Sequence, residues 1–395
     1  MPELQTRPRP VAPDPRAAWP RARALLAHAA PALAAYAAVR AVGLLVLALW
    51  APAAGKDALH LLGGRWDSVW YQRIAEHGYG YTATLPDGGV HPDLAFFPLL
   101  PALERGLAAV TPFTVEGAGI AVAWSAGLLA AWGIFAVGAR LRDRRTGVVL
   151  AALWGAYPTG FVQSMAYTET LFTACAAWSL YAVLKGRWVT AGALCVLAGL
   201  TRPTAAALIA ALAVTAVTAL VREHRTGDRH GLLRRNARML LGVCLAPLGW
   251  LGYVVFVAVR QGGPFAYFDV QARWGNSIDG GRALAGFIAG LPLPAALGLC
   301  AALGLLGWLV VLCVRQRQPL PVLVYTVAVV VVSLIGSGYF GSRPRLMMPA
   351  FPLLLPPAVA LAGIRTTART AVALTFLALA SAVYGAWTLL GSGPP

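Results

Sequence analysis

Long apolar blocks joined by short polar connections constrain the fold of this chain more than any other feature. About 20 mostly apolar residues cross the hydrocarbon core of a membrane. Eleven blocks approach or exceed this length, at residues 28–51, 116–139, 147–165, 168–184, 188–200, 204–221, 239–259, 284–314, 319–336, 347–364 and 370–390. Only 12% of the 395 residues are charged, against about a quarter in soluble domains. The sequence therefore predicts an all-α, polytopic integral membrane protein with about 11 transmembrane helices.

Three blocks depart from a simple span. Block 188–200 is short, and block 284–314 is long enough to be tilted, broken or preceded by an interfacial turn. Residues 95–112 contain Pro98 and Pro101 and are too short for a clean span. We expect this segment to be a juxtamembrane or re-entrant element, next to interfacial helices in the first external loop.

The distribution of basic residues predicts the orientation. Residues 1–27 form a Pro/Arg-rich tail that we expect to be disordered and cytoplasmic, followed by the transmembrane domain 28–390 and a short external tail, 391–395. With the N-terminus inside, the inner connections hold 21 basic and five acidic residues, and the outer ones hold ten of each. Because cytoplasmic connections are enriched in Lys and Arg, the formal net charge of +17 is a topology signal. Nucleic-acid binding is not expected.

Two further compositional features bear on the class of protein. The five cysteines all lie inside apolar blocks without metal-ligand spacing, so we interpret them as packing residues. The first apolar run is too long for a signal peptide and is expected to remain as a span. The strong use of Arg over Lys indicates a GC-rich genome and a bacterial plasma membrane.

The predicted topology places every polar, motif-like segment on the outer face. These segments are the loop 52–115, Tyr167-Thr168-Glu169, Thr201-Arg202-Pro203-Thr204, the loop 260–283 and Ser342-Arg343-Pro344-Arg345. The outer face is therefore where we expect the functional site.

The segment 65–77 of the first loop combines aromatic and ionisable residues. If it is helical, Trp66, Trp70 and Ile74, with Val69, share one face that would lie in the membrane interface. Asp67 would then lie at the edge of that face, where a partly desolvated carboxylate is a better base. The alternative is a helix N-terminal carboxylate or a partner of Arg65.

Further acidic and imidazole groups follow in the same loop, at Glu76, His77, His91 and Asp93. Together with Asp67 they have the ligand types of a divalent metal site for Mg²⁺ or Mn²⁺. Their spacing matches no metal motif, so we assign no metal ligand and no firm cofactor. Solvated loop residues are the alternative.

Arginines at the outer ends of the apolar blocks form a second set of candidates. Arg202, Arg343 and Arg345 present guanidinium groups that match a phosphate at headgroup level. The alternative is interfacial anchoring by snorkelling. Glu169 is an acid at the outer end of a span, where acids are often functional. Arg40, within the first span, is expected to be a structural or snorkelling residue.

Several of these segments resemble the GPI mannosyltransferase II (PIG-V) family. Trp66-Asp67, Ile74-Ala75-Glu76-His77-Gly78-Tyr79 and Ala95-Phe96-Phe97-Pro98 with Pro101 resemble its first lumenal loop. Tyr167-Thr168-Glu169 is similar to its Tyr-Ser-Glu, and Arg202-Pro203-Thr204 to its Arg-containing segment. The resemblance covers about residues 60–205, with Arg343 and Arg345 as weaker matches.

The resemblance implies a GT-C type glycosyltransferase. Such an enzyme would take mannose from a polyprenyl-phosphate-mannose donor and transfer it, with inversion, to a hydroxyl of a glycan or lipid acceptor on the non-cytoplasmic face. The general base carries over to Asp67, and Arg202, Arg343 and Arg345 would bind the donor phosphate. The supporting or acceptor-binding residues would be Trp66, Glu76, His77, Asp93, Tyr167 and Glu169.

Two other functions stay open at this point. The first is transfer of another sugar from a polyprenyl phosphate, because sugar choice depends on pocket shape. The second is a transporter or flippase of a lipid-linked sugar. A transporter concentrates ionisable groups near the midplane of broken helices, whereas here they gather at one face, which favours the enzyme.

Overall fold

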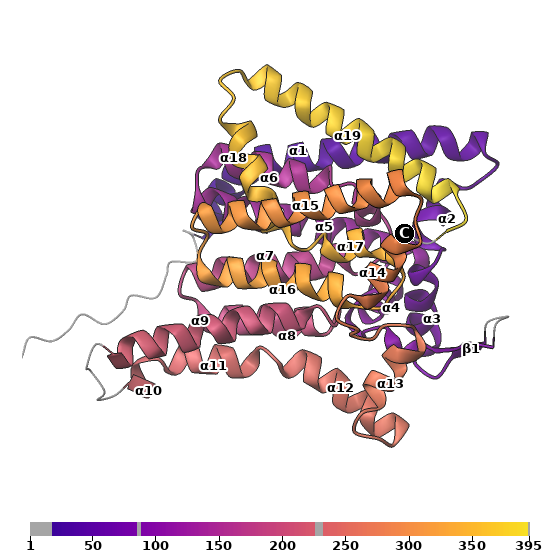
Figure 1. Cartoon of the computed structure of the whole chain (residues 1–395), viewed down its shortest axis with the longest axis horizontal. Coiled ribbons are helices and arrows are strands. Elements are labelled where there is room, and N and C mark those ends of the chain that lie inside the picture. Colours follow the sequence, from indigo (N-terminus) through magenta and orange to yellow (C-terminus); the bar gives the residue numbers. More distant parts are fainter. Residues whose placement is uncertain (1–17, 85–87, 226–231, 394–395) are drawn as a thin grey trace, which may run out of the picture.

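The computed structural model describes residues 18–84, 88–225 and 232–393, and most of them are helical (Figure 1). The helices of the N-terminal half are α1 (Ala18–Ala53), α2 (Ala58–Gly63), α3 (Asp67–His77), α4 (Leu99–Val110), α5 (Val115–Leu141), α6 (Arg144–Gly155), α7 (Glu169–Leu184), α8 (Trp188–Gly199) and α9 (Ala205–Arg225). Those of the C-terminal half are α10 (Leu232–Arg235), α11 (Ala237–Leu245), α12 (Leu248–Gln261), α13 (Ala266–Arg273), α14 (Arg282–Ala289), α15 (Leu293–Arg315), α16 (Leu320–Ile335), α17 (Arg343–Met347), α18 (Leu355–Ala362) and α19 (Thr367–Leu390).

Short elements complete the chain. Strands β1 (Thr82–Thr84) and β2 (Val90–Pro92) pair antiparallel, with Ala83 opposite His91. The 3₁₀ turns are η2 (Asp93–Ala95), η3 (Gly160–Ser164), η4 (Phe340–Ser342) and η5 (Phe351–Leu354). The all-α class is confirmed. Because α1 begins at Ala18, residues 18–27 of the expected tail are helical, whereas residues 1–17 lie outside the described part.

Six helical segments of the described chain are long and apolar enough to cross a membrane. They lie in α1, α5, α9, α15, α19 and the continuous pair of α11 with α12. A seventh span results if Phe340–Met347 and Phe351–Ala362, bent by 77° at their break, count as one. Three further apolar helices, α7, α8 and α16, are shorter. The chain is a membrane protein as expected, but the predicted count of about eleven spans is not confirmed.

The difference in span count has a physical cause in the breaks within the apolar blocks. Block 147–165 contains most of α6, which ends at Gly155 two residues before Tyr157, and then only the short turn η3. Pro158 disfavours a helical conformation at Tyr157. Block 284–314 divides into α14 and α15 at Leu291-Pro292, which is the broken form that the sequence allowed. A hydropathy count registers apolar residues but not where the helix stops.

Close helix packing in the bundle depends on pairs of glycines. A methyl group at Gly138 of α5 would lie 2.9 Å from Cα of Gly147 in α6. A methyl group at Gly192 of α8 would lie 2.2 Å from the carbonyl oxygen of Gly242 in α11. Small residues let helix backbones approach this closely in membranes, where van der Waals packing drives association.

The buried face of α3 differs from the expected one. Ser68, Tyr71, Ile74 and Ala75 are buried, whereas 46% of Val69 is exposed. The expected face of Trp66, Trp70 and Ile74 with Val69 is therefore wrong in its orientation. The reason is that α3 packs on α4, whose residues include the fully buried Leu100, instead of presenting its aromatic face to lipid.

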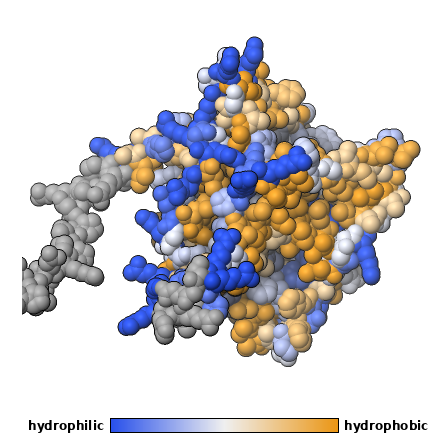
Figure 2. Space-filling view, turned by 60° about the vertical axis from the view of Figure 1, so that its left-hand side comes forward, coloured by the Kyte–Doolittle hydropathy of each residue, from blue (hydrophilic) through white to orange (hydrophobic). Residues whose placement is uncertain are grey.

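The two ends of the bundle have different character. The loop elements α2, α3, β1, α13, α14 and α17 gather at the right-hand end in Figure 1, which we call the site end. Helix α10 and the turn between α18 and α19 lie at the opposite end. Figure 2 brings that opposite end forward, and hydrophilic residues gather there beside a broad apolar face. The polar segments thus converge on one end, as expected, and the direction of insertion stays a prediction.

Arg40 has a structural role within α1. Its Nη1 donates a hydrogen bond to the carbonyl oxygen of Gly155 at 3.0 Å, and its Nη2 donates to Oγ of Ser164 at 3.0 Å. Gly155 is the last residue of α6, and a guanidinium there satisfies a terminal carbonyl of the helix. The interpretation of Arg40 as a structural partner is confirmed.

Candidate active site

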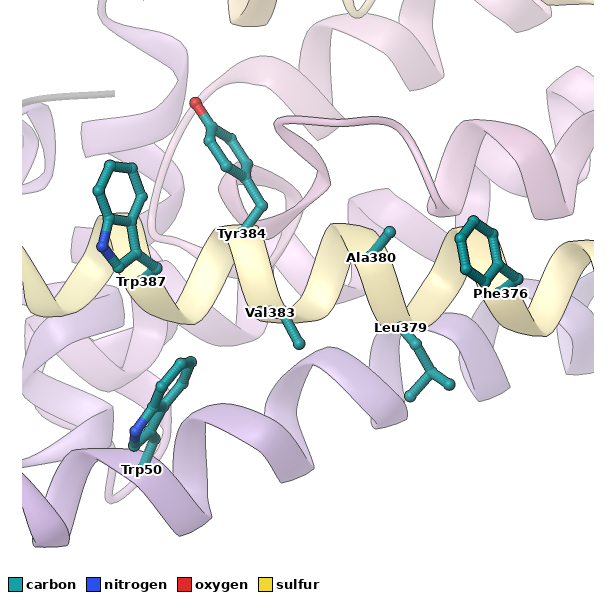
Figure 3. A pocket seen from close by; sticks show the side chains of 7 residues that line it. All are labelled: Trp50, Phe376, Leu379, Ala380, Val383, Tyr384 and Trp387. Carbon is teal, nitrogen blue, oxygen red and sulfur yellow. The ribbon is translucent and has the colours of Figure 1, made fainter.

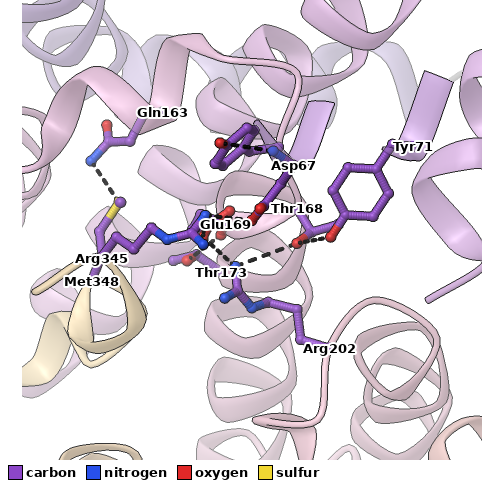
Figure 4. Close-up of polar contacts among 10 residues, drawn as sticks. Asp67, Tyr71, Gln163, Thr168, Glu169, Thr173, Arg202, Arg345 and Met348 are labelled. Atoms are coloured by element: carbon purple, nitrogen blue, oxygen red, sulfur yellow. Dashed lines mark hydrogen bonds and ion pairs between the residues drawn. The ribbon is translucent and has the colours of Figure 1, made fainter. Parts of the chain in front are cut away.

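Four charged residues from four separate segments meet at the site end (Figure 4). Asp67 is the first residue of α3, and Glu169 is the first residue of α7. Arg202 lies in the turn between α8 and α9, and Arg345 lies in α17. We call Asp67, Glu169, Arg202 and Arg345 the acid–arginine cluster.

Local structure explains where the two carboxylates lie. Free N–H groups and the helix dipole make the first turn of a helix favourable for a negative charge. The residue before Asp67 has an unusual backbone, because Trp66 has a φ of 51°. Such a conformation in a residue other than glycine costs about 1–3 kcal/mol and is found most often at functional sites. The turn at Trp66 directs Asp67 toward the cluster.

Arg345 joins the two acids. Its Nη1 lies 2.6 Å from Oδ2 of Asp67 and 3.5 Å from Oε1 of Glu169. Its guanidinium carbon lies 5.1 Å from the centre of the Tyr167 ring, within the range of a cation–π contact. Its Nε is buried and has no hydrogen-bond partner within the described residues. Arg345 therefore keeps one N–H donor unused within the described residues.

Arg202 completes the cluster from the other side. It forms an ion pair with Glu169, and its Nη1 donates to Oγ1 of Thr168 at 3.3 Å. The hydroxyls of Thr168 and Tyr71 are 3.3 Å apart. Burial, followed by the charge of Asp67, raises the pKa of Tyr71 above its ordinary value. The Tyr71 phenol is thus a neutral hydrogen-bonding group beside the charged cluster.

Tyr167 connects the cluster to the start of α3. Its hydroxyl accepts a hydrogen bond from the backbone N–H of Asp67 at 3.2 Å. Burial, followed by the charge of Asp67, raises its pKa well above the ordinary value of a tyrosine. The phenol of Tyr167 is therefore neutral, and it holds the backbone of Asp67 in place through this hydrogen bond.

Exposure separates the members of the cluster. The exposed fraction of the side chain is 1% for Glu169, 11% for Arg345, 12% for Arg202 and 29% for Asp67. Arg345 contacts only one oxygen of Asp67, and no donor within the described chain is assigned to the other, Oδ1. Asp67 is therefore the member that an incoming hydroxyl group reaches most readily.

Arg65 is not the partner of Asp67 that the sequence left open. Its Nη1 and Nη2 donate to the carbonyl oxygens of Leu389 and Gly391, at 2.5 and 3.0 Å. Its guanidinium carbon lies 4.0 Å from the centre of the Trp66 ring. Trp66 thus packs between Arg65 and the protein core and does not enter the cluster.

Arg343 is also separate from the cluster, although it is two residues from Arg345. Its Nη1 and Nη2 donate to the carbonyl oxygens of Leu334 and Gly336, at 2.7 and 2.6 Å. These carbonyls lie at the end of α16 and just beyond it. Arg343 therefore stabilises the backbone at the end of α16 by these hydrogen bonds.

The remaining acids and imidazoles of the first loop do not join the cluster. Asp93 is buried, and its Oδ2 accepts hydrogen bonds from the backbone N–H groups of Gly80 and Tyr81, both at 2.9 Å. Glu76 and His77 are exposed and lie 3.8 Å from each other. Within the described residues no group of three or more His, Cys, Asp or Glu side chains is placed to hold a metal ion.

Aromatic rings line the neighbouring part of the first loop. The ring of Trp70 stacks on Phe96 at 5.4 Å between centroids and meets Trp274 edge-on at 4.9 Å. The indole N–H of Trp274 donates to the carbonyl oxygen of Pro92 at 2.9 Å. The 260–283 loop is thereby tied to the first loop, which agrees with the expected convergence of these segments.

One buried acid was missed in the sequence. Glu104 in α4 is 1% exposed, and its Oε2 has no hydrogen-bond partner in the described chain. Burial, followed by the charge of Glu76, raises the pKa of Glu104 to about 9. The available signal was a single acid within the otherwise apolar run 99–110, next to Arg105.

This helical membrane bundle is similar in fold to solved structures of ArnT. The solved structure of ArnT from Cupriavidus metallidurans bound to undecaprenyl phosphate superposes with a TM-score of 0.52 and 15% sequence identity. The match covers 86% of this chain but 63% of ArnT, so this chain spans less than two thirds of that protein's length. The apo structure of the same ArnT gives a TM-score of 0.49 at 15% identity, over 81% of this chain and 68% of that chain.

Comparison with protein-family models and with curated proteins gives no match. At 15% identity, the similarity to ArnT establishes the fold alone. The function is therefore argued from the acid–arginine cluster.

Proposed function

We propose that this protein is a membrane glycosyltransferase that transfers mannose from polyprenyl-phosphate-mannose to a hydroxyl group of a glycan or lipid acceptor, on the non-cytoplasmic face. The observation that carries this proposal is the acid–arginine cluster within a GT-C fold. It combines a partly exposed carboxylate, Asp67, with two arginines, Arg202 and Arg345.

The two arginines suit a phosphate-linked donor. Guanidinium groups match the geometry of a phosphate, and the buried Nε of Arg345 is free among the described residues. The ArnT structure contains undecaprenyl phosphate, which is a polyprenyl phosphate without a sugar. The donor phosphate would bind at Arg202 and Arg345, with its lipid tail among the helices.

The proposed reaction is a single displacement. Oδ1 of Asp67 accepts the proton of the acceptor hydroxyl, whose oxygen forms a bond to the anomeric carbon from the face opposite the phosphate. The bond between that carbon and the phosphate oxygen breaks, and its electron pair leaves with the polyprenyl phosphate. The anomeric configuration is inverted. The transition state has oxocarbenium character, as in other glycosyl transfers.

Charge stabilisation is the main task of the arginines in this reaction. Negative charge develops on the leaving phosphate, and preorganised cations in a site with little water stabilise it strongly. Glu169 contacts both Arg202 and Arg345 and is almost fully buried. Glu169 is therefore a positioning residue that fixes both guanidinium groups.

Mannose and the acceptor class rest on the resemblance to the PIG-V family. Another polyprenyl-phosphate sugar fits the same cluster, because the arginines contact the phosphate and not the sugar. Testing donors that differ only in the sugar, with the same polyprenyl phosphate, distinguishes these cases. The proposal requires mannose to be transferred faster than arabinose or glucose.

The substitution Asp67→Asn tests the reaction. Removal of a general base costs about 10²–10⁴-fold in rate, and we expect a loss in this range. The assay follows release of polyprenyl phosphate from radiolabelled polyprenyl-phosphate-mannose, with membranes of the producing cells supplying the acceptor. Asp269→Asn is the control, because Asp269 is an exposed acid on α13.

Thermal unfolding in detergent must show that the Asp67→Asn variant is folded. Full activity of this variant would overturn the role of Asp67. Translocation of the donor by the wild-type protein without release of polyprenyl phosphate would identify a transporter instead.

A further inference from the structure

An apolar groove lies along α19, beside Trp50 of α1, on the outside of the bundle (Figure 3). It has a volume of about 580 Å³ and is lined by Trp50 of α1 and by Phe376, Leu379, Ala380, Val383, Tyr384 and Trp387 of α19. Leu379 and Val383 point from α19 toward α1. The lining side chains are well exposed, with 71% of Phe376 and 67% of Trp387 accessible. The groove can therefore take up an apolar chain from the membrane.

The groove has the length of one membrane leaflet. From Phe376 to Trp387 the helix rises by about 16 Å, at 1.5 Å per residue, which is about half of the 30 Å hydrocarbon core. It runs toward the site end, where α19 ends at Leu390. Trp50, Tyr384 and Trp387 lie near that end, and aromatic side chains of this kind favour the headgroup region. The groove thus belongs to the leaflet nearest the acid–arginine cluster.

Two cations lie at the C-terminal end of α19, just beyond the last groove residue, Trp387. Nζ of Lys56 donates to the carbonyl oxygen of Leu390 at 2.6 Å, and Arg65 donates to those of Leu389 and Gly391. Because these partners are uncharged carbonyl oxygens, Lys56 and Arg65 have no carboxylate partner within the described residues. The nearby acid, Asp57, is the N-cap of α2 and accepts from the N–H of Leu59 at 3.0 Å.

From this geometry we propose that the groove binds an anionic glycerophospholipid of the surrounding bilayer. Its acyl chain lies along α19 beside Trp50 of α1, and its phosphate lies at Lys56 and Arg65. The site is separate from the proposed donor site, which uses Arg202 and Arg345. An apolar groove with cations at the headgroup level is complementary to such a lipid, whereas a zwitterionic lipid gains less from the cations.

The lipid also contacts the chain that leads to Asp67. Arg65 stacks on Trp66, which directly precedes Asp67 and has the unusual backbone conformation. A phosphate bound to Arg65 therefore steadies the turn that places Asp67 in the cluster. We expect sugar transfer to be faster in a bilayer that contains anionic lipid.

Photolabelling of the full chain in nanodiscs tests the site. The probes are phosphatidylglycerol and phosphatidylcholine, each with a diazirine on the acyl chain, and labelled peptides are mapped by mass spectrometry. Peptides of α1 and α19 should be labelled preferentially by phosphatidylglycerol. Because each basic residue near the surface favours an anionic lipid by roughly fivefold, Lys56→Gln and Arg65→Gln should each reduce the preference by about that factor.

Two further variants make the test specific. Ala380→Trp fills the groove and should reduce labelling there by both probes. Arg260→Gln removes an exposed cation of α12 that donates to the carbonyl oxygen of Tyr79, and it should leave the groove labelling unchanged. Equal labelling by the two probes, or a preference that survives both Lys56→Gln and Arg65→Gln, would overturn the proposal.

The lipid site and the proposed function can fail independently. Release of polyprenyl phosphate is compared in nanodiscs of phosphatidylcholine alone and of phosphatidylcholine with phosphatidylglycerol, and Lys56→Gln should reduce the difference. If phosphatidylglycerol labels the groove of the wild-type protein selectively but the protein releases no polyprenyl phosphate, the transferase is refuted and the lipid site is supported. Release without selective labelling refutes the lipid site alone.

Discussion

Arg343 and Arg345 belong to the same short helix, and both are buried, yet they have different partners. Arg345 contacts the carboxylates of Asp67 and Glu169. Arg343 donates to the backbone carbonyls of Leu334 and Gly336. Arg345 belongs to the acid–arginine cluster, which includes the partly exposed Asp67. Arg343 instead holds the backbone that follows α16. Two arginines of the same short motif, Ser342-Arg343-Pro344-Arg345, therefore have different contacts in the structure.

Two buried acids give a parallel comparison. Glu169 and Glu104 are both 1% exposed. Glu169 pairs with Arg202 and Arg345, whereas Glu104 has no ion pair among the described residues and its pKa is raised to about 9. A buried carboxylate stays charged when it has a cation beside it, and otherwise it takes up a proton. Partners, more than burial, decide which charged residues serve the proposed reaction.

Among the variants that test these two comparisons, Arg345→Gln has the largest expected effect. Loss of a group that stabilises developing charge typically costs about 10²–10³-fold in turnover, and we expect this loss in release of polyprenyl phosphate. The protein should still fold, because Arg202 remains as a partner of Glu169. Arg345→Lys keeps the charge without the planar donor fork and should give an intermediate rate. If Arg345→Gln kept the turnover of the wild type, Arg345 would have no more part in the reaction than Arg343.

Glu104→Gln tests the unpaired acid through pH. In the folded protein Glu104 keeps its proton up to about pH 9, whereas in the unfolded chain it loses the proton near pH 4.5. The free energy of unfolding contributed by Glu104 therefore falls as pH rises through this range, by roughly 2–4 kcal/mol between pH 5 and pH 8. Glu104→Gln cannot ionise and should remove this decline.

Thermal unfolding in detergent at pH 5 and pH 8 measures the effect. The variant should gain stability over the wild type at pH 8 and little at pH 5. Asp269→Asn, which changes an exposed acid, is the matched control. An equal shift at both pH values would mean that Glu104 is ionised in the folded state.

The smallest expected effect comes from Arg343→Met. It removes the donors for two carbonyls near the end of α16 and should lower the free energy of unfolding by about 1–3 kcal/mol. Turnover per folded molecule should change far less than in Arg345→Gln, because Arg343 does not contact the cluster. Measuring both quantities on both variants sharpens the comparison. A loss of turnover equal to that of Arg345→Gln would return Arg343 to the phosphate site.

The class of fold was predictable, but the number of spans was not. Hydropathy identified a helical membrane protein because burial in lipid requires long apolar runs with internally satisfied backbones. Its count of about eleven is higher than the six or seven long apolar segments of the described chain, because α6 ends at Gly155 and because the segment around α17 and α18 is sharply bent. Helix breaks depend on Pro, on caps and on neighbouring helices, which a sum of hydropathy values does not contain.

The candidate site was predictable in part. Asp67, Glu169, Arg202 and Arg345 were selected from their residue types and positions in the outer segments, and Tyr167 from the resemblance to the PIG-V family. The structure brings these five together. Asp93 was selected for the same reason but binds the backbone N–H groups of its own loop. Glu104 was missed, because its isolation from cations is visible only after α4 has packed on α5.

By itself, the sequence determined that this protein lies in a membrane and that its charged segments converge on one end. These properties follow from composition and from the alternation of apolar and polar segments. Only the tertiary structure decided that Arg345, and not Arg343, contacts Asp67. The physical reason is that side-chain pairing depends on the direction in which each helix end points, and packing between distant helices sets that direction.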